Sequence, residues 1–143
     1  MPGPATSAPP VETVVETAVY AADLSAAEAF YAGVLGLPVI GRETGRHVFF
    51  RVGAGNVLLV FDPTTTARAG EFPPHGATGP GHFALGVRPE TLDEWRRHLA
   101  QSGVAIEKEF AWPRGGHSLY FRDPAGNSVE LVTPGVWGTP AGW

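Results

Sequence analysis

Three side chains able to bind a metal or transfer a proton stand in stretches that are otherwise apolar: Glu16, His82 and Glu130. In a β-strand, side chains two residues apart share a face, so apolar neighbours mark the face that packs on the core. Val129 and Leu131 fit that face, which turns Glu130 to the opposite side. An acidic side chain on the inner face of an apolar strand needs a partner, either a cation or a hydrogen-bond donor. These residues therefore predict metal ligation through nitrogen and oxygen, or acid–base chemistry.

The same alternation assigns other side chains to the inner, pocket-facing side of the strands. His82 shares this face with Ala84 and Gly86, small residues that leave room for a ligand. The side chains that we expect to contact a substrate are His47, Phe49, Arg51, Tyr120 and Arg122, together with Trp112 in a predicted loop. An inward arginine can alternatively neutralise the glutamates. Trp112 and Trp137 are candidates to cover an apolar pocket, although packing is the commoner use of tryptophan.

The composition excludes several classes of protein. The 143 residues are 43% hydrophobic and 17% charged with a net charge of −4, which is typical of one globular domain. No basic tract suits a nucleic acid, and no run of about 18 apolar residues suits a membrane span. The chain has no cysteine, which excludes thiolate chemistry and fits a reducing cytoplasm. Residues 1–12 carry no signal-peptide pattern and are predicted to be a flexible tail.

Hydrophobic periodicity predicts the same order of elements twice: one strand, one helix and three strands, βαβββ. Pairing Asn56 with Asn127 aligns FFRVGAGNVLLV with YFRDPAGNSVELV, and pairing Glu16 with His82 aligns the first strands. The extra residues of the second module fall in 107–116, where we expect a longer loop. The predicted organisation is module one at 13–62, a linker at 63–80, module two at 81–134 and a tail at 135–143. The strands are expected at 13–22, 37–43, 47–52, 56–61, 82–87, 104–110, 118–122 and 128–133, and the helices from Asp23 or Ser25 and over 91–101.

Together with the two modules, the segments DLSAAEAFYAGVLGLPV, GHFALGV and FRDPAGNSVELV resemble the vicinal oxygen chelate superfamily. This superfamily includes glyoxalase I, fosfomycin and bleomycin resistance proteins, methylmalonyl-CoA epimerase and extradiol dioxygenases. The resemblance covers about residues 13–134. It implies an α+β fold in which the two modules form a curved eight-stranded mixed sheet around a central pocket, with the helices outside.

The resemblance also implies a metal site, because the metal-dependent members take ligands from the first and last strands of each module. The matching positions hold Glu16, His82 and Glu130, whereas the fourth holds Leu59, which cannot bind a metal. Three ligands leave positions open for two substrate oxygens. The implied cofactor is one divalent ion among Fe, Mn, Ni, Co and Zn, with Glu16 and Glu130 also the catalytic carboxylates.

These features predict a glyoxalase-like, metal-dependent isomerase or lyase that acts on a small molecule. A dioxygenase is less favoured, because the two-His, one-carboxylate triad of oxygenases is not present. The alternative is a metal-free drug-binding protein of the bleomycin-resistance type, which Leu59 and Glu16 favour. A third interpretation is a metal-free enzyme that uses Glu16 and Glu130 as acid and base. The resemblance to the superfamily implies a homodimer whose sites are shared between the two chains. The sequence contains no glycine-rich phosphate loop followed by a helix, so we expect no bound nucleotide.

Overall fold

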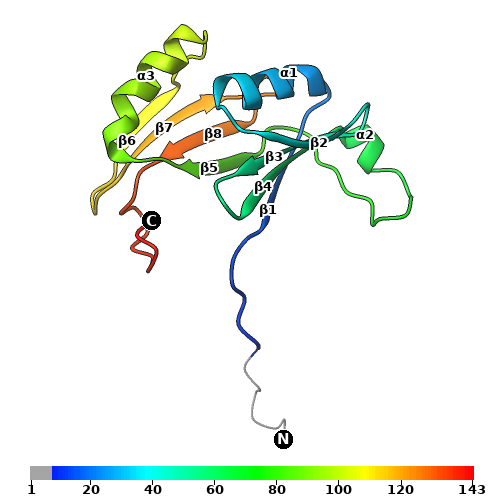
Figure 1. Cartoon of the computed structure of the whole chain (residues 1–143), viewed down its shortest axis with the longest axis horizontal. Coiled ribbons are helices and arrows are strands. Elements are labelled where there is room, and N and C mark those ends of the chain that lie inside the picture. The colour runs from blue at the N-terminus through cyan, green and yellow to red at the C-terminus, as the bar shows by residue number, and fades with distance from the viewer. Residues whose placement is uncertain (1–7) are drawn as a thin grey trace, which may run out of the picture.

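The computed structural model of the chain describes residues 8–143 (Figure 1). It contains two modules in which the same elements follow one another, and they match the predicted βαβββ order. In the first module these are β1 (Glu16–Tyr20), α1 (Leu24–Glu28) continued by the π-helical η1 (Ala29–Val34), β2 (Val39–Glu43), β3 (His47–Val52) and β4 (Asn56–Phe61). A short helix α2 (Pro63–Thr66) follows. The second module has β5 (His82–Gly86), the 3-10 helix η2 (Pro89–Thr91), α3 (Leu92–Gln101), β6 (Lys108–Ala111), β7 (His117–Arg122) and β8 (Ser128–Val132).

The strands form two four-stranded sheets with equivalent topology, ordered β1-β4-β3-β2 and β5-β8-β7-β6. The first strand of each module runs parallel to the last strand, and the other neighbours are antiparallel. The predicted α+β fold of two repeated modules is therefore confirmed, with the eight strands hydrogen-bonded as two sheets.

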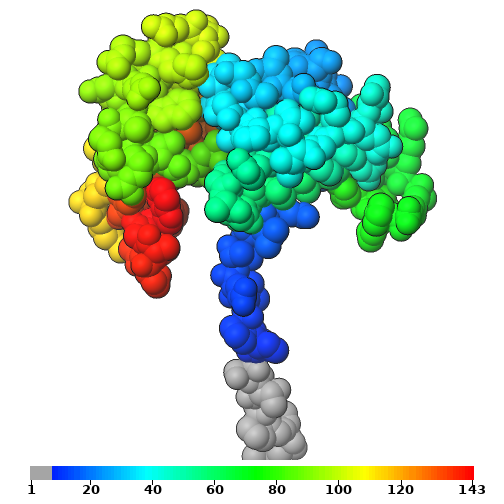
Figure 2. Space-filling view, viewed as in Figure 1, coloured from blue at the N-terminus to red at the C-terminus, as the bar shows by residue number. Residues whose placement is uncertain are grey.

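The helices α1, η1 and α3 cover the same side of the two sheets, whereas the short α2 lies beside the first sheet (Figure 1). The apolar side chains on that side form one core that draws on both modules, including the fully buried Phe50, Leu99 and Phe121. The opposite, helix-free side of the sheets carries the alternate residues of every strand. The N-terminal segment projects away from this side, whereas the C-terminal segment lies against the second module (Figure 2).

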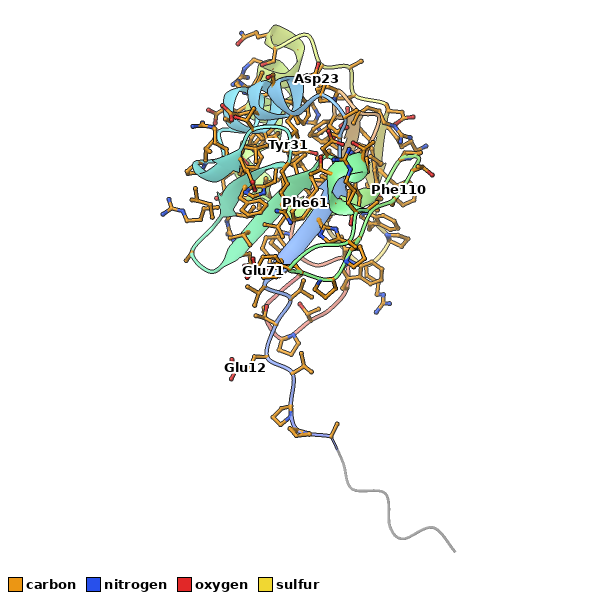
Figure 3. All side chains as sticks on the ribbon, turned by 90° about the vertical axis from the view of Figure 1, so that its right-hand side faces the viewer. Glu12, Asp23, Tyr31, Phe61, Glu71 and Phe110 are labelled. Carbon is orange, nitrogen blue, oxygen red and sulfur yellow. The ribbon has the colours of Figure 1, made fainter. Side chains whose placement is uncertain are left out.

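A buried tyrosine joins the two modules. Tyr31 lies in η1, inside the molecule (Figure 3), and its hydroxyl donates to Oδ2 of Asp123 at 2.8 Å in the β7–β8 turn. Burial, followed by the negative charge of Asp123, raises the pKa of Tyr31 far above its ordinary value, so the phenol stays protonated. The Asn127 amide in the same turn donates to the backbone oxygen of Tyr20 at 3.2 Å. These contacts fix the sheets relative to each other.

The structure refines several predicted boundaries. Of the two predicted helix starts, Asp23 is the N-cap, because its carboxylate accepts from the backbone N–H of Ala26 at 2.9 Å. Gly36 takes a positive φ of 69° where the helix ends, as a C-terminal glycine allows. The helix α2 was not predicted and lies inside the expected linker.

The predicted longer loop is present between β6 and β7, at 112–116, whereas the equivalent β2–β3 turn spans only 44–46. Strand β6 begins later than predicted, at Lys108. The predicted N-terminal tail lies partly outside the described residues, and residues 8–15 within it form no helix or strand and are largely exposed. In the described part of the chain, none of the helices has the length and apolar character that crossing a bilayer demands.

Candidate functional site

The second module brings together two of the three predicted ligands, His82 and Glu130. They stand on the neighbouring parallel strands β5 and β8, and both project from the helix-free side. Nε2 of His82 lies 3.3 Å from Oε1 of Glu130. The imidazole is about half exposed, whereas the carboxylate residue is buried, with 8% of its surface accessible. The pair therefore has an imidazole that is open to solvent and a carboxylate held within the protein.

The carboxylate of Glu130 is held by a hydrogen-bonded series of side chains. The Ser118 hydroxyl donates to Oε2 of Glu130 at 2.6 Å, and the indole N–H of Trp112 donates to the Ser118 hydroxyl at 2.8 Å. Oε1 is thereby left to face His82. Burial and the nearby Glu130 charge raise the pKa of Tyr120, so its phenol is neutral and able to donate a hydrogen bond at neutral pH.

The imidazole of His82 is also oriented by the protein. Nδ1 lies 3.1 Å from the backbone oxygen of Ser128. A carbonyl oxygen can only accept, so Nδ1 carries the proton and Nε2 points to Glu130. A lone pair on Nε2 and a carboxylate oxygen repel each other unless a proton or a metal ion lies between them. Histidine ligands to metals commonly donate their second N–H to a backbone carbonyl in this way.

The separation of these two atoms fits a shared metal ion. Nitrogen and oxygen ligands lie about 2.0–2.2 Å from a zinc-like ion, which places two neighbouring ligand atoms about 2.9–3.4 Å apart. The 3.3 Å between Nε2 of His82 and Oε1 of Glu130 falls in this range. His82 and Glu130 are thus suitable as two ligands of a divalent ion.

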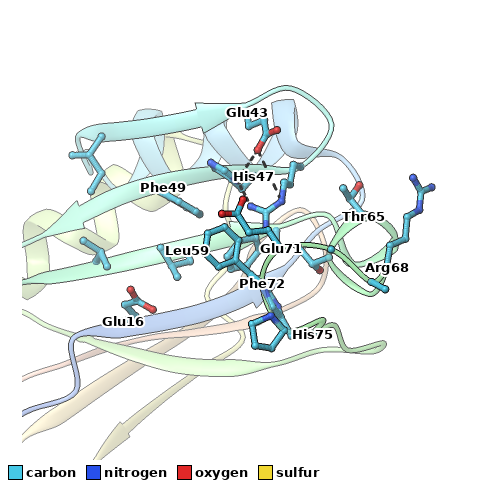
Figure 4. A pocket seen from close by; sticks show the side chains of 18 residues that line it. Glu16, Glu43, His47, Phe49, Leu59, Thr65, Arg68, Glu71, Phe72 and His75 are labelled. Carbon is cyan, nitrogen blue, oxygen red and sulfur yellow. Dashed lines mark hydrogen bonds and ion pairs between the residues drawn. The ribbon is translucent and has the colours of Figure 1, made fainter.

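The third predicted ligand, Glu16, lies in the other module and does not join this pair. It lines a separate cleft of about 840 Å³ on the helix-free side of the first sheet, near Leu59 (Figure 4). Within residues 8–143 there is no group of three or more His, Asp or Glu side chains close enough to hold one ion. One chain by itself therefore brings together only two of the three predicted ligands.

The cleft of the first module combines an aromatic wall with charged side chains, among them Glu16, Glu43 and Arg46. The rings of His47 and Phe49 stack at 3.9 Å with an angle of 6° between their planes, and Phe61 meets Phe49 edge-on at 5.4 Å. The connection after β4 forms the opposite wall, where His75 packs edge-on against Phe61 at 4.6 Å. Nδ1 of His75 is 2.9 Å from the Tyr20 hydroxyl. This surface suits a planar or apolar group.

His47 has a defined protonation state within the cleft. Burial lowers its pKa, and the positive charge of Arg46 lowers it further, against a smaller opposing effect of Glu43. A guanidinium nitrogen of Arg46 lies 2.9 Å from Nδ1 of His47. Because arginine only donates, Nδ1 accepts and the neutral ring carries its proton on Nε2.

Of the side chains predicted to contact a substrate, some lie on the pocket-facing side and others are engaged or exposed elsewhere. His47, Phe49 and Tyr120 lie on the pocket-facing side, as the alternation predicted. Arg122 instead forms a bidentate ion pair with Glu107 at 2.8 and 3.2 Å, and Arg51 is exposed at the far end of β3.

The two tryptophans that were candidates to cover a pocket also differ in their surroundings. Trp112 reaches the site through Ser118, as described above, whereas the Trp137 side chain is 74% exposed.

The contacts of two further residues were not predicted from the sequence. The strand alternation placed Ser118 on the inner face, but only the fold shows that it donates to Glu130. His75 lies in a stretch rich in glycine and proline, which gave no indication that it returns to β1. The signal that could have identified Ser118 is a small polar residue placed diagonally from an inward acid on the neighbouring strand, since Ser118 opposes Val132, two residues from Glu130.

Comparison with known proteins places these features in context. Residues 13–131 match the family model of the Glyoxalase/Bleomycin resistance protein/Dioxygenase superfamily. A lactoylglutathione lyase from Agrobacterium tumefaciens is 42% identical, covers 92% of this chain and 100% of its own, and superposes with a TM-score of 0.87. The oxidase ChaP-H2 is 26% identical over 85% of this chain and 93% of its own, with a TM-score of 0.61. A superfamily member from Nocardioides shows the same fold at 22% identity, a TM-score of 0.70, and coverage of 96% and 91%.

Proposed function

Because the chain belongs to the Glyoxalase/Bleomycin resistance protein/Dioxygenase superfamily, we propose that it is a metal-dependent lyase or isomerase acting on a small molecule with two neighbouring oxygens. A glyoxalase-like role is supported by the 42% identity to a lactoylglutathione lyase over nearly the whole chain. That likeness also makes lactoylglutathione the first compound to test.

The observation that carries the metal proposal is the His82–Glu130 pair. Its two ligand atoms are 3.3 Å apart, and both side chains are oriented from behind, by Ser128 and Ser118 respectively. Such supporting contacts are typical of ligands whose positions must not change. A divalent ion bound there supplies Lewis-acid polarisation of two adjacent substrate oxygens.

We propose that Glu16 of a second chain completes the site in a homodimer. Glu16 occupies the position in β1 that His82 occupies in β5, and like His82 it is exposed on the helix-free side. Two copies that face each other through these sides would place the acid of one module against the pair of the other. The exposed carboxylate and the half-exposed imidazole are then both covered.

The side chains divide the remaining work according to their surroundings. The Glu16 carboxylate, which is the more accessible acid, takes a proton from the carbon that bears a hydroxyl and returns it to the neighbouring carbonyl carbon. The hydroxyl proton passes to the other oxygen, so the product is an isomer of the substrate. Glu130 is held in one orientation by Ser118, and the neutral Tyr120 phenol donates to a substrate oxygen. The aromatic cleft of Phe49 and Phe61 binds the non-reacting part.

Metal content measured by inductively coupled plasma mass spectrometry, on protein without a histidine tag, tests this function. A His82→Ala, Glu130→Ala double variant should lose a near-stoichiometric ion and the turnover of lactoylglutathione. The control is a His117→Ala, Glu109→Ala double variant, because Nε2 of His117 and Oε1 of Glu109 are also 3.3 Å apart but lie on the surface beside Arg96. It should keep both metal and activity. Sedimentation velocity of both variants shows whether each still forms the proposed dimer.

A wild-type protein that takes up none of Mn, Fe(II), Co, Ni or Zn would overturn the metal proposal. In that case the aromatic cleft, lined by Phe49, Leu59 and Phe61, favours the drug-binding alternative. Binding of bleomycin to the metal-free protein, measured by calorimetry, would then be the decisive experiment.

A further inference from the structure

The segment that follows β8 returns to the pocket-facing side of the second module. Its Trp143 ring lies directly over Gly86 of β5, so that a Cβ added to Gly86 would meet Cη2 of the indole at 2.3 Å. Leu85 and Phe83 pack on the core, so Gly86 presents the same face as His82. The indole therefore lies on the face that carries the His82–Glu130 pair.

This segment is held in place by its own contacts. The backbone N–H of Gly135 donates to the oxygen of Gly142 at 2.8 Å, and that of Thr139 donates to the oxygen of Trp143 at 2.9 Å. Val136 lies so close to Gly116 that an added Cβ there would be 2.5 Å from Cγ2 of the valine. The segment is thus closed on itself and packed against the β6–β7 loop that carries Trp112. In Figure 2 it lies against the second module.

The first module has a comparable arrangement. Its last strand, β4, is also followed by a segment that returns to the end of the first strand, where His75 contacts Tyr20. Tyr20 is the last residue of β1, as Gly86 is of β5. In both modules an aromatic side chain from the following segment lies at this position, and in the second module a glycine provides the space for it.

We propose that Trp143 is a specificity-determining residue of the His82–Glu130 site, and this inference rests on the function proposed above. Ala84 is paired with Glu130 and stands two residues from Gly86, so the indole lies about 7 Å further along β5. At this distance the ring forms an end wall that limits the size of the substrate group beside the pair. With 37% of its surface exposed, Trp143 remains accessible to that group.

Two substitutions should remove this wall by different routes. Trp143→Ala deletes the ring, and Gly86→Ala displaces it because the new Cβ would overlap the indole. The matched control is Trp137→Ala, since Trp137 lies in the same segment but is 74% exposed. Circular dichroism and thermal melting establish that each variant folds.

The first measurement compares kcat/KM for two thiohemiacetals: the one that glutathione forms with methylglyoxal, which the proposed proton transfer converts to its isomer lactoylglutathione, and the one that it forms with phenylglyoxal. Trp143→Ala and Gly86→Ala should each raise the phenyl-to-methyl ratio about tenfold, the scale on which an apolar pocket discriminates by size. Trp137→Ala should leave the ratio unchanged. Unchanged ratios in the first two variants, with activity and metal content retained, would overturn the proposal.

The second measurement is independent of catalysis. Binding of 8-anilinonaphthalene-1-sulfonate, followed by its fluorescence, should rise severalfold in Trp143→Ala and Gly86→Ala relative to Trp137→Ala, because the covered face becomes accessible. Equal binding by all the variants would contradict the proposed wall even in a protein without glyoxalase-like activity. If the proposed function itself is wrong, the wild-type protein will bind no metal and show no turnover, and this outcome is distinct from a failure of the proposed wall.

Discussion

The first, third and fourth strands of each module have the same arrangement, but the side chains on their pocket-facing side differ in chemistry between the two modules. In the second module, Glu130 and His82 form a polar pair, and Ser118 supports it. In the first, the positions equivalent to Glu130 and Ser118 are Leu59 and His47, and they belong to an aromatic cleft. Core positions on the other face remain alike, as Phe50 and Phe121 are both fully buried.

This difference shows which face of the repeat sets the fold and which sets the function. The helix-facing residues must fill one continuous core, so large apolar side chains are needed in both modules. The pocket-facing residues do not have to fill that core, and they range from the exposed Glu16 to the buried Ser118 and Glu130. At these positions the second module presents a polar His–Glu pair, whereas the first presents aromatic and apolar side chains.

The sharpest way to break this comparison is to give the second module the residue of the first. Glu130→Leu should abolish metal binding and lower kcat/KM by more than the roughly 10–100-fold that loss of a residue supporting a ligand produces, because a ligand itself is removed. Leu59 shows that leucine is accommodated at this place in the repeat, so we expect the variant to fold. Metal analysis and steady-state kinetics measure both effects.

The control for Glu130→Leu is Leu59→Ala in the first module. It should keep the metal and raise KM, since it removes apolar contact only. Loss of metal in Leu59→Ala, or retention of metal in Glu130→Leu, would show that the division between the two faces is wrong.

A smaller effect is expected from Ser118, which acts through Glu130. Ser118→Ala removes the 2.6 Å hydrogen bond to Oε2 and leaves the Trp112 N–H without its acceptor. Metal affinity should fall about 10–100-fold, measured by competition with a chelator. Ser118→Thr keeps the hydroxyl and should restore most of the affinity. Trp112→Phe removes only the more distant donor, so its metal affinity should lie between those of Ser118→Ala and Ser118→Thr. An unchanged metal affinity in Ser118→Ala would refute the positioning role of Ser118.

Much of the fold was accessible from the sequence because the repeat is local. Strands β3 and β4 begin and end where the alternation of Val48, Phe50 and Leu58 predicted, since their core-facing side chains are uniformly apolar. The turn residues Gly53 and Gly126, which lie in the two aligned segments, adopt positive φ angles that glycine takes without steric cost. Helix α2 was missed because four residues contain too little periodicity to detect.

The site was only partly accessible for a different reason. Alternation places Glu130 and His82 on the pocket face, and strand pairing then brings them together. Whether Glu16 reaches them depends on how modules or chains face each other, which no local pattern encodes. The contacts of His75 and Trp143 arise from segments rich in glycine and proline, where the path of the backbone is set by tertiary packing.

The smallest expected effect concerns the charge of His47 in the first module. Its pKa is lowered from the ordinary value of 6.5, mainly by burial and then by Arg46. In the window from 6.5 down to the lowered pKa, the unfolded chain binds more protons than the folded one. His47 therefore contributes stability above pH 6.5 that is progressively lost as the pH falls through this window.

His47→Gln should remove this contribution, so urea unfolding of the variant between neutral pH and pH 5 should depend less on pH than that of the wild type. Arg46→Met should raise the pKa of His47, measured by NMR titration of the imidazole, without restoring 6.5, because burial is the larger cause. A His47 that titrates at or above 6.5 in the wild type would contradict both expectations. It would mean that burial beside Phe49 and Phe61 does not disfavour the charged imidazole, and the contrast between the aromatic wall of the first module and the polar pair of the second would be weaker.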